Sequence, residues 1–327
     1  MDSAKTDSAL IWSDRWRLGA LTNNELMNIG FVSVLIGFLY ILFHLFGNTV
    51  DNVNTTSAFK WMISRWGDKQ SFGADYSHGY LIPFVSLGVI WYKREEFFAA
   101  SKQVCRLGLV VIIMALAMHW MGAKMQQTRL SLMSLILLLW GIPFYFYGWQ
   151  VAKLLIFPCS YLIFCVPLNF LDALSGPLQR IATSVGHTML VEMGIECQRV
   201  GTQLISPYFQ LNVEAACSGL RSLLAMTALT AVYAYYTQDT VVKKWLLFLC
   251  SIPIAVAGNV GRIISIALVS ITTGQEYGAG LHHDWSGYVL FTVAISLMIG
   301  FGKLLKVNYK ELFVSWKKAY LSHSSPS

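Results

Sequence analysis

A single cysteine stands at a sharp change of composition in the stretch "NVEAACSGLRSLL", residues 212–224. Alternating apolar residues around Pro207 predict a short hairpin or extended segment before it, and Ser218 is a suitable cap for the apolar helix that follows. A thiol at a helix N-terminus, with Arg221 one turn further on, is favoured in its thiolate form. Cys217 is therefore a candidate nucleophile, whereas the more common role of a membrane cysteine is that of a small buried hydrophobe.

Arg262 interrupts the otherwise apolar stretch "PIAVAGNVGRIISIALVS". An ionisable side chain in such a segment is costly and usually has a function. The alternative is an arginine whose long side chain only extends to the membrane interface. Gly258, Asn259 and Gly261 lie beside it, and we interpret them as a loosened backbone that lines a site, with Asn259 as a supporting polar group.

Two adjacent histidines and an aspartate occur in "LHHDWSG". Neighbouring helical residues point about 100° apart, so His282 and His283 are poorly placed to hold one ion, and no third ligand of suitable spacing is evident. We expect no metal and no other cofactor. One histidine is better suited to carry a proton for a thiol. A helix that starts near Asp284 would put His283 at its entrance, and Asp284 or Glu276 could orient the imidazole.

The composition defines the class of protein. Of the 327 residues, 55% are hydrophobic and only 13% are charged, whereas a soluble domain is about 25% charged. The chain is therefore expected to be a multi-pass membrane protein. Its net charge of +7 comes mostly from basic residues in short loops and near the C-terminal end, as is typical of membrane proteins, so nucleic-acid binding is not expected.

The apolar runs predict an all-α bundle of about eight membrane spans. A span needs about 20 mostly apolar residues. The candidates are roughly 29–47, 79–92, 107–121, 130–148, 154–171, 219–236, 244–258 and 285–306. A further run at 263–273 would rise only about 16 Å as a helix, so we interpret 259–284 as a re-entrant or half-buried element.

The lysines and arginines predict the orientation. Cytoplasmic loops carry an excess of these residues, which are frequent in 93–106, in 237–244 and from Lys306 onward. These segments are expected to be cytoplasmic. The short loop that carries Lys124 and Arg129 would then lie outside, against the rule. Counting spans from the cytoplasmic segments brings the candidate cysteine, arginine and histidine together at the outer side of the membrane.

The expected domain organisation is simple. Residues 1–28 form a polar cytoplasmic segment without a signal peptide. Residues 29–307 form one transmembrane domain, and residues 308–327 form a cytoplasmic tail. The chain ends soon after the last span, so no further C-terminal domain is expected.

Four segments together resemble the exosortase/archaeosortase family of membrane cysteine transpeptidases. They are "ACSGLRS", "NVGRI", "HHDWSGYVLF" and the early "YSHGYLIPFVSLGVIW", and the resemblance extends from about residue 70 to 307. It implies that Cys217 is the nucleophile and that Arg262 and His283 are catalytic. The family histidine is followed after three residues by a glycine, which matches His283 with Gly287. His78, in the early segment, either belongs to a substrate entrance or stabilises a local turn.

The resemblance also implies the partners and the location. Substrates would be exported proteins that carry a short C-terminal motif, a transmembrane helix and a basic tail. The protein would lie in the bilayer of the cell's inner or plasma membrane, with its active site facing the extracytoplasmic side and a link to exopolysaccharide export. A different class stays open: a transporter or export component for an exopolysaccharide or lipid-linked glycan, without covalent catalysis. That alternative accounts for Arg262 but not for a thiol at a helix start.

The predicted orientation can be tested with reporter fusions. Alkaline phosphatase, which folds only outside the cytoplasm, is expected to be inactive when fused after Ser315 and active when inserted within residues 274–284, because only the first of these segments follows a lysine-rich stretch. Phosphatase activity after Ser315 would show that the tail is outside and that the three candidate residues do not share one face.

Overall fold

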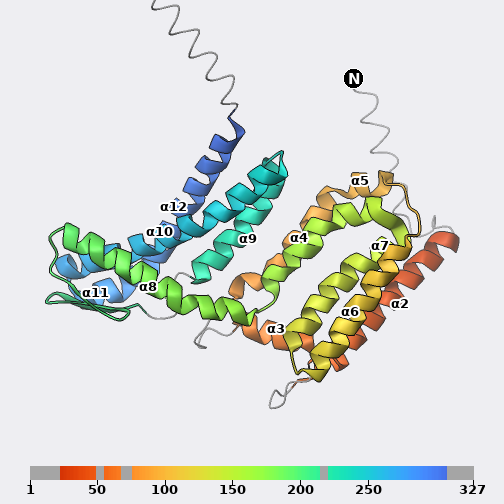
Figure 1. Ribbon diagram of the computed structural model, residues 1–327, viewed down its shortest axis with the longest axis horizontal. Coiled ribbons are helices and arrows are strands. Elements are labelled where there is room, and N and C mark those ends of the chain that lie inside the picture. Colours follow the sequence, from red (N-terminus) through yellow and green to blue (C-terminus); the bar gives the residue numbers. More distant parts are fainter. Residues whose placement is uncertain (1–22, 49–54, 68–75, 214–219, 308–327) are drawn as a thin grey trace, which may run out of the picture. The chain divides into compact units, whose positions relative to one another are not determined.

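The computed structural model describes residues 23–48, 55–67, 76–213 and 220–307 (Figure 1). They fold mainly into helices, with one small antiparallel sheet. The chain divides into two compact units, residues 1–61 with 106–142 and residues 62–105 with 143–327. In the described part, four helices are long and apolar enough to cross a membrane: Arg106–Lys124, Thr128–Cys165, Val241–Thr273 and Trp285–Lys306. The protein is thus a helical, multi-pass membrane protein.

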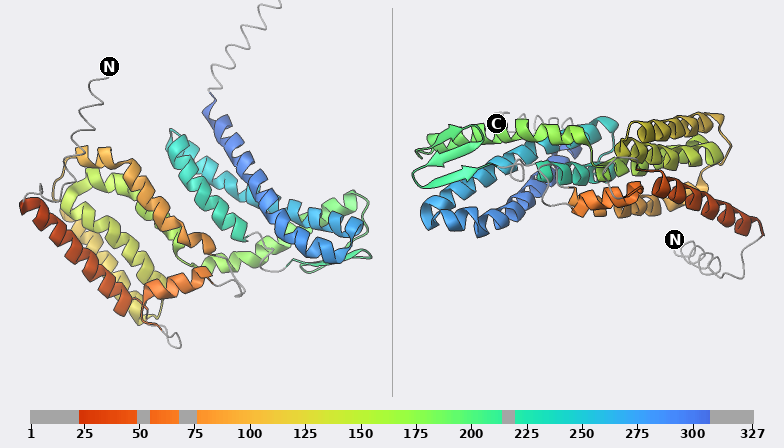
Figure 2. Two further views of the ribbon diagram at one scale, coloured as in Figure 1. Left: turned by 180° about the vertical axis from the view of Figure 1, so that it is seen from behind. Right: turned by 90° about the horizontal axis from the view of Figure 1, so that it is seen from below.

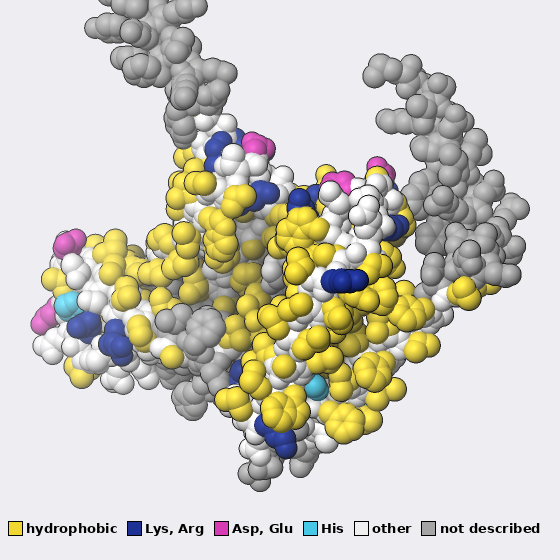
Figure 3. Space-filling model, turned by 45° about the vertical axis from the view of Figure 1, so that its right-hand side comes forward, with side chains coloured by type: hydrophobic (Ala, Val, Ile, Leu, Met, Phe, Trp, Pro, Cys, Tyr) yellow, Lys and Arg dark blue, Asp and Glu magenta, His cyan; other side chains and the backbone are white. Residues whose placement is uncertain are grey.

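The first unit contains α2 (Asn23–Leu45), α6 (Arg106–Lys124) and the first arm of α7 (Thr128–Tyr161). Phe43, Ala115 and Leu138 are almost fully buried where these helices meet. Gly141 allows α7 to approach α6 closely, since a Cβ there would lie 2.9 Å from Val111 Cγ1. In both units, hydrophobic side chains cover the middle of the helices and charged ones lie mainly near the ends (Figure 3), as helices in lipid require.

A turn at Gly148 divides α7 into two arms. Its φ of 77° lies in the left-handed region that glycine adopts readily and other residues rarely do. A Cβ at Gly148 would also lie 2.5 Å from the backbone oxygen of Gln103. The two arms correspond to the predicted runs 130–148 and 154–171.

In the second unit, η2 (Ser77–Tyr80) and α4 (Ile82–Tyr92) pack against the end of α7 and η3 (Leu162–Cys165). Side chains hydrogen-bond to backbone oxygens across this contact. Ser86 Oγ donates to Pro158 O at 2.7 Å, and Trp66 Nε1, from α3 (Ala58–Gly67), donates to Cys165 O at 2.8 Å. Such bonds satisfy buried polar groups that lipid cannot satisfy. α5 (Arg94–Ala99) follows α4.

A small sheet follows α8 (Asn169–Glu192). Its strands are β1 (Gln198–Val200), β2 (Gln203–Ser206) and β3 (Phe209–Asn212), in the order β1-β2-β3 and all antiparallel. Ser206 pairs with Phe209, which confirms the hairpin predicted around Pro207. Leu204, Phe209 and Leu211 are buried together with side chains of α8 and α10. Figure 2 shows the strands beside α8 and the far end of α10. We call the buried cluster that Leu204, Phe209 and Leu211 form with side chains of α8 and α10 the sheet core.

The helix α10 (Val241–Thr273) differs from the predicted re-entrant element at 259–284. Residues 259–273 continue the helix that begins at Val241, and Gly258 and Gly261 do not interrupt it. The run 263–273 is apolar because Ile263, Ile266 and Ala267 are buried in the sheet core. Their hydrophobicity therefore reflects contact with protein.

Three helices complete the second unit. α9 (Leu220–Thr237) and α12 (Leu281–Lys306) both pack along α10, and the short α11 (Gln275–Ala279) links α10 to α12. α12 begins at Leu281, three residues before the start predicted near Asp284. α4 has 11 residues and α9 has 18, and neither is among the four long apolar helices. The predicted total of about eight spans is therefore not confirmed.

Candidate active site

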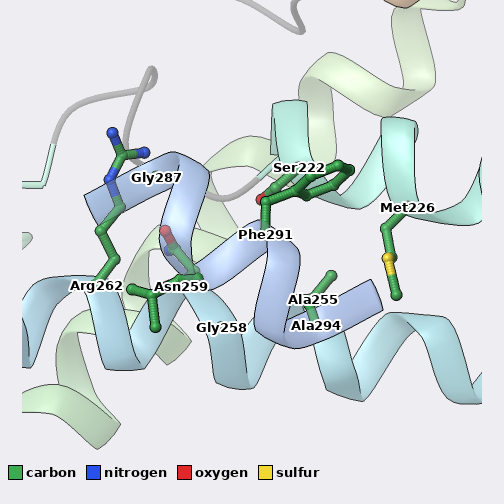
Figure 4. Close-up of a pocket in the computed structure, with 10 residues that line it drawn as sticks. Ser222, Met226, Ala255, Gly258, Asn259, Arg262, Gly287, Phe291 and Ala294 are labelled. Atoms are coloured by element: carbon green, nitrogen blue, oxygen red, sulfur yellow. The ribbon is translucent and has the colours of Figure 1, made fainter. Parts of the chain in front are cut away.

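A pocket lies where α9, α10 and α12 meet (Figure 4). α9 contributes Ser222 and Met226. α10 contributes Ala255, Gly258, Asn259 and Arg262, and α12 contributes Gly287, Leu290, Phe291 and Ala294. On each of the last two helices the residues follow the spacing i, i+3, i+4, i+7, which forms one helical face. Glycines and alanines on these faces leave space between the helices.

The guanidinium of Arg262 lies beside Gly287 of α12 (Figure 4). A Cβ at Gly287 would lie 3.2 Å from Nη2 and 3.3 Å from Cζ of Arg262. A side chain at position 287 would therefore press on the guanidinium. The glycine in α12 thus creates the space that Arg262 occupies.

The position of Arg262 along α10 indicates its depth in the membrane. This residue follows Val241 by 21 positions, which corresponds to about 32 Å along the helix axis. The hydrocarbon core of a bilayer is about 30 Å thick. If α10 begins at one membrane surface, Arg262 lies near the opposite surface. The helix continues for 11 residues beyond it into the sheet core, which holds this end in place.

The pocket is lined by both polar and apolar side chains. Asn259, one turn before Arg262, is only 5% exposed and lines the pocket together with Ser222. Met226, Ala255, Phe291 and Ala294 line the remainder. A positive charge beside apolar walls interacts more strongly with an oxygen anion than it does in water, because the local dielectric constant is low. The polar part of the lining is therefore suited to stabilise negative charge on a bound oxygen.

Cys217 and Ser218 lie outside the described residues, but the structure describes the chain on both sides of them. Val213 is 3% exposed in the sheet core, and its N–H donates to Thr202 O at 3.1 Å. The description resumes at Leu220, where α9 begins. Arg221 is the second residue of α9, and its side chain lies outside the described part. The segment with the candidate nucleophile thus starts at the sheet core and ends next to the pocket.

The backbone of α12 assigns helical positions to the two histidines. His283 lies 4, 7 and 11 residues before Gly287, Leu290 and Ala294, all of which line the pocket. It therefore shares their helical face. His282 lies 4, 7 and 11 residues before Ser286, Val289 and Val293, which are 4%, 60% and 48% exposed and do not belong to the pocket lining. The side chains of His282, His283 and Asp284 lie outside the described part of the chain.

His78 does not belong to the described lining of this pocket. Its Nε2 lies 3.2 Å from Phe164 O, and its ring stacks on Tyr76. The first of these contacts joins η2 to η3, 86 residues further along the chain, so the predicted stabilisation of a local turn also stays a prediction. A role in substrate entry stays a prediction.

Cys197 is a free thiol in the sheet core, 8% exposed. Burial raises the pKa of this thiol, although a hydrogen bond from the Ile205 backbone partly opposes the effect. A buried cysteine of raised pKa is a weak nucleophile at neutral pH. The structure therefore favours a packing role for Cys197.

Sequence reasoning missed Ser222 and the apolar residues of the pocket lining. The only signal was indirect: small residues recur at helical spacing in both "AVAGNVGR" and "GYVLFTVA". Which of these faces lipid and which faces another helix depends on how α9, α10 and α12 pack. Among the described side chains, no group of three histidines, cysteines or acidic residues is suited to hold a metal.

Comparison with known families identifies the class of protein. Residues 66–300, more than two thirds of the 327-residue chain, match the model of the transmembrane exosortases. The chain therefore belongs to the transmembrane exosortase family. No curated protein and no solved structure gives a match.

Gly287→Ala tests the contact between α12 and Arg262. The added methyl would force the guanidinium to shift by a few tenths of an ångström, so the activity of the protein is expected to fall about 5- to 50-fold, while the amount of protein in the membrane stays the same. The matched control is Gly300→Ala on the same helix, where no atom lies within 4 Å of the added Cβ. Equal activities of the two variants would show that the position of the guanidinium is not critical.

Proposed function

We propose that this protein is a membrane cysteine transpeptidase or protease that cleaves the C-terminal sorting signal of exported proteins at the outer membrane face. The observation that carries the proposal is the convergence of three segments on one pocket. α10 contributes Arg262, the first turn of α12 carries His283 on the pocket face, and α9 begins three residues after Cys217. Three residues of chain span at most about 11 Å, which supports a thiol close to the pocket.

The proposed reaction begins at the thiol of Cys217. His283 accepts its proton, the thiolate attacks the scissile carbonyl, and the carbonyl electrons move onto oxygen. Arg262 stabilises this oxyanion. The oxyanion collapses, the C–N bond breaks, and His283 donates the proton to the departing amine, which leaves a thioester. Water, an amine or a glycan hydroxyl then attacks the thioester and restores the thiol.

The choice of arginine has a physical reason. A guanidinium has several N–H donors in a fixed plane, so it can bind an oxyanion and keep contact with a second acceptor. Contact with Gly287 restricts where this plane can lie. Transition-state stabilisation of this kind contributes a few kcal/mol when the donors are held in place before the reaction.

The depth of the site fits the proposed substrate. A protein anchored by a C-terminal transmembrane helix presents the residues just before that helix at the membrane surface. Arg262 lies about one bilayer thickness from the start of α10, so the site and such a motif would meet at the same level. The lysines at the start of α10 and the end of α12 favour the extracytoplasmic side for the site, in the inner or plasma membrane.

Cys217→Ala tests the covalent step. Because the nucleophile is lost, processing is expected to fall by at least about 10³-fold, while the protein still accumulates in the membrane. Cys197→Ser is the control, because this thiol is buried away from the pocket lining, and it should keep most of the activity. Full activity of Cys217→Ala would instead favour the transporter or export alternative. If both variants were inactive and a crosslink were lost on non-reducing gels, a structural disulfide would explain the result.

The two histidines are distinguished by their positions on α12. His283→Ala is expected to abolish processing, and His282→Ala should retain most of it, because only position 283 shares the face of Gly287 and Leu290. Alkylation of Cys217 with iodoacetamide at fixed pH should be slower in His283→Ala, since a nearby imidazolium favours the thiolate. An inactive His282→Ala with an active His283→Ala would reverse the assignment. Activity of both variants would remove histidine from the mechanism.

A further inference from the structure

A second and larger cavity lies in the same unit, far along α10 from Arg262. It is a groove with a cavity volume of about 340 Å³, open on one side, between the end of α7, η3, α9 and the first two turns of α10. Its wall is mainly apolar and includes Phe157, Ile163, Phe164, Ala231, Ala234 and Phe248. Because these helices lie in a membrane, an open apolar groove of this size is expected to contain an acyl chain.

One end of the groove is cationic. The Nζ atoms of Lys93 and Lys244 lie 5.7 and 5.0 Å from the centre of the Tyr235 ring. That ring stacks on Phe157 of the groove wall, with 3.9 Å between centroids. The two ammonium groups therefore flank one aromatic side chain at the mouth of the groove.

The charges at this mouth are not balanced. Glu96 pairs with Lys93 at 3.0 Å. For Lys244 the structure gives no carboxylate partner among the described residues. The first turn of α10 contains Lys243 beside it and no acidic residue. An anion at the mouth would therefore be attracted, whereas a polypeptide helix with a basic flank would be repelled.

We propose that this groove is a binding site for an anionic phospholipid. One acyl chain lies along the apolar wall, and the phosphate contacts Lys244, with Lys93 nearby. Val241, Lys244, Trp245 and Phe248 follow the spacing i, i+3, i+4, i+7, so one face of α10 presents both the cation and the apolar wall. On the orientation predicted from the basic residues, the lipid belongs to the cytoplasmic leaflet, where anionic lipids are attracted by juxtamembrane lysines. The bound lipid would join α7 to α9 and α10.

Native mass spectrometry of the full chain in detergent tests the proposal, with phosphatidylglycerol, phosphatidylcholine and inorganic phosphate as separate additives. The wild-type protein is expected to bind phosphatidylglycerol about tenfold more tightly than phosphatidylcholine. Lys244→Gln should reduce this preference to about twofold or less. The control Lys303→Gln, an exposed lysine in the last turn of α12, should preserve it. Without lipid, all three proteins should melt at the same temperature.

A second variant tests the groove itself. Ala231→Trp fills the apolar wall and should weaken binding of both lipids about equally, because it removes the space for the acyl chain and leaves both lysines. Equal retention of the two lipids by the wild-type protein would overturn the proposal, because it would show no preference for an anionic headgroup. The same loss of preference in Lys303→Gln as in Lys244→Gln would overturn it in favour of general surface charge. If inorganic phosphate, at the same concentration as phosphatidylglycerol, displaced the lipid, the site would bind a free anion without need of the groove. That result would also overturn the proposal.

Discussion

The contact between Arg262 and Gly287 is the constraint on which the site depends. A guanidinium is costly in an apolar helix, and a side chain at position 287 of α12 would press on it, with a Cβ only 3.2 Å from Nη2. The contact lies on the face of α12 that packs against α10, and position 283 belongs to that same helical face. A charge, a glycine and one helical register thus form a single arrangement.

The sheet core explains how that register is maintained at the end of a long helix. Ile263, Ile266 and Ala267 follow Arg262 directly and are buried against α8 and the sheet. Val213, in the same core, precedes the segment that carries Cys217. One packed cluster therefore fixes both the arginine helix and the chain that leads to the candidate nucleophile. Lipid alone, which is fluid, could not hold these two segments in a constant relation.

The two cavities lie at different positions along α10. Arg262 and the small pocket lie toward one end, and Lys244 and the larger groove lie at the other. In both, a basic residue stands beside an apolar wall, but only the first has a buried amide, Asn259, next to the cation. The first arrangement suits a reacting oxygen that needs several fixed donors, and the second suits a phosphate that needs only charge at the membrane surface.

The sequence by itself determined the membrane class, a hairpin or extended segment around Pro207, the apolar runs 130–148 and 154–171, and the three motifs that carry the candidate residues. These features depend on composition and on local turn chemistry, so they can be predicted from the sequence without knowledge of the fold. Tertiary structure decided that 263–273 extends α10, that α12 starts at Leu281, and that Ser222 joins the pocket. Hydropathy is the same whether an isoleucine faces lipid or a protein core, because both remove it from water. Only the packing of α8 and the sheet against α10 distinguishes the two cases.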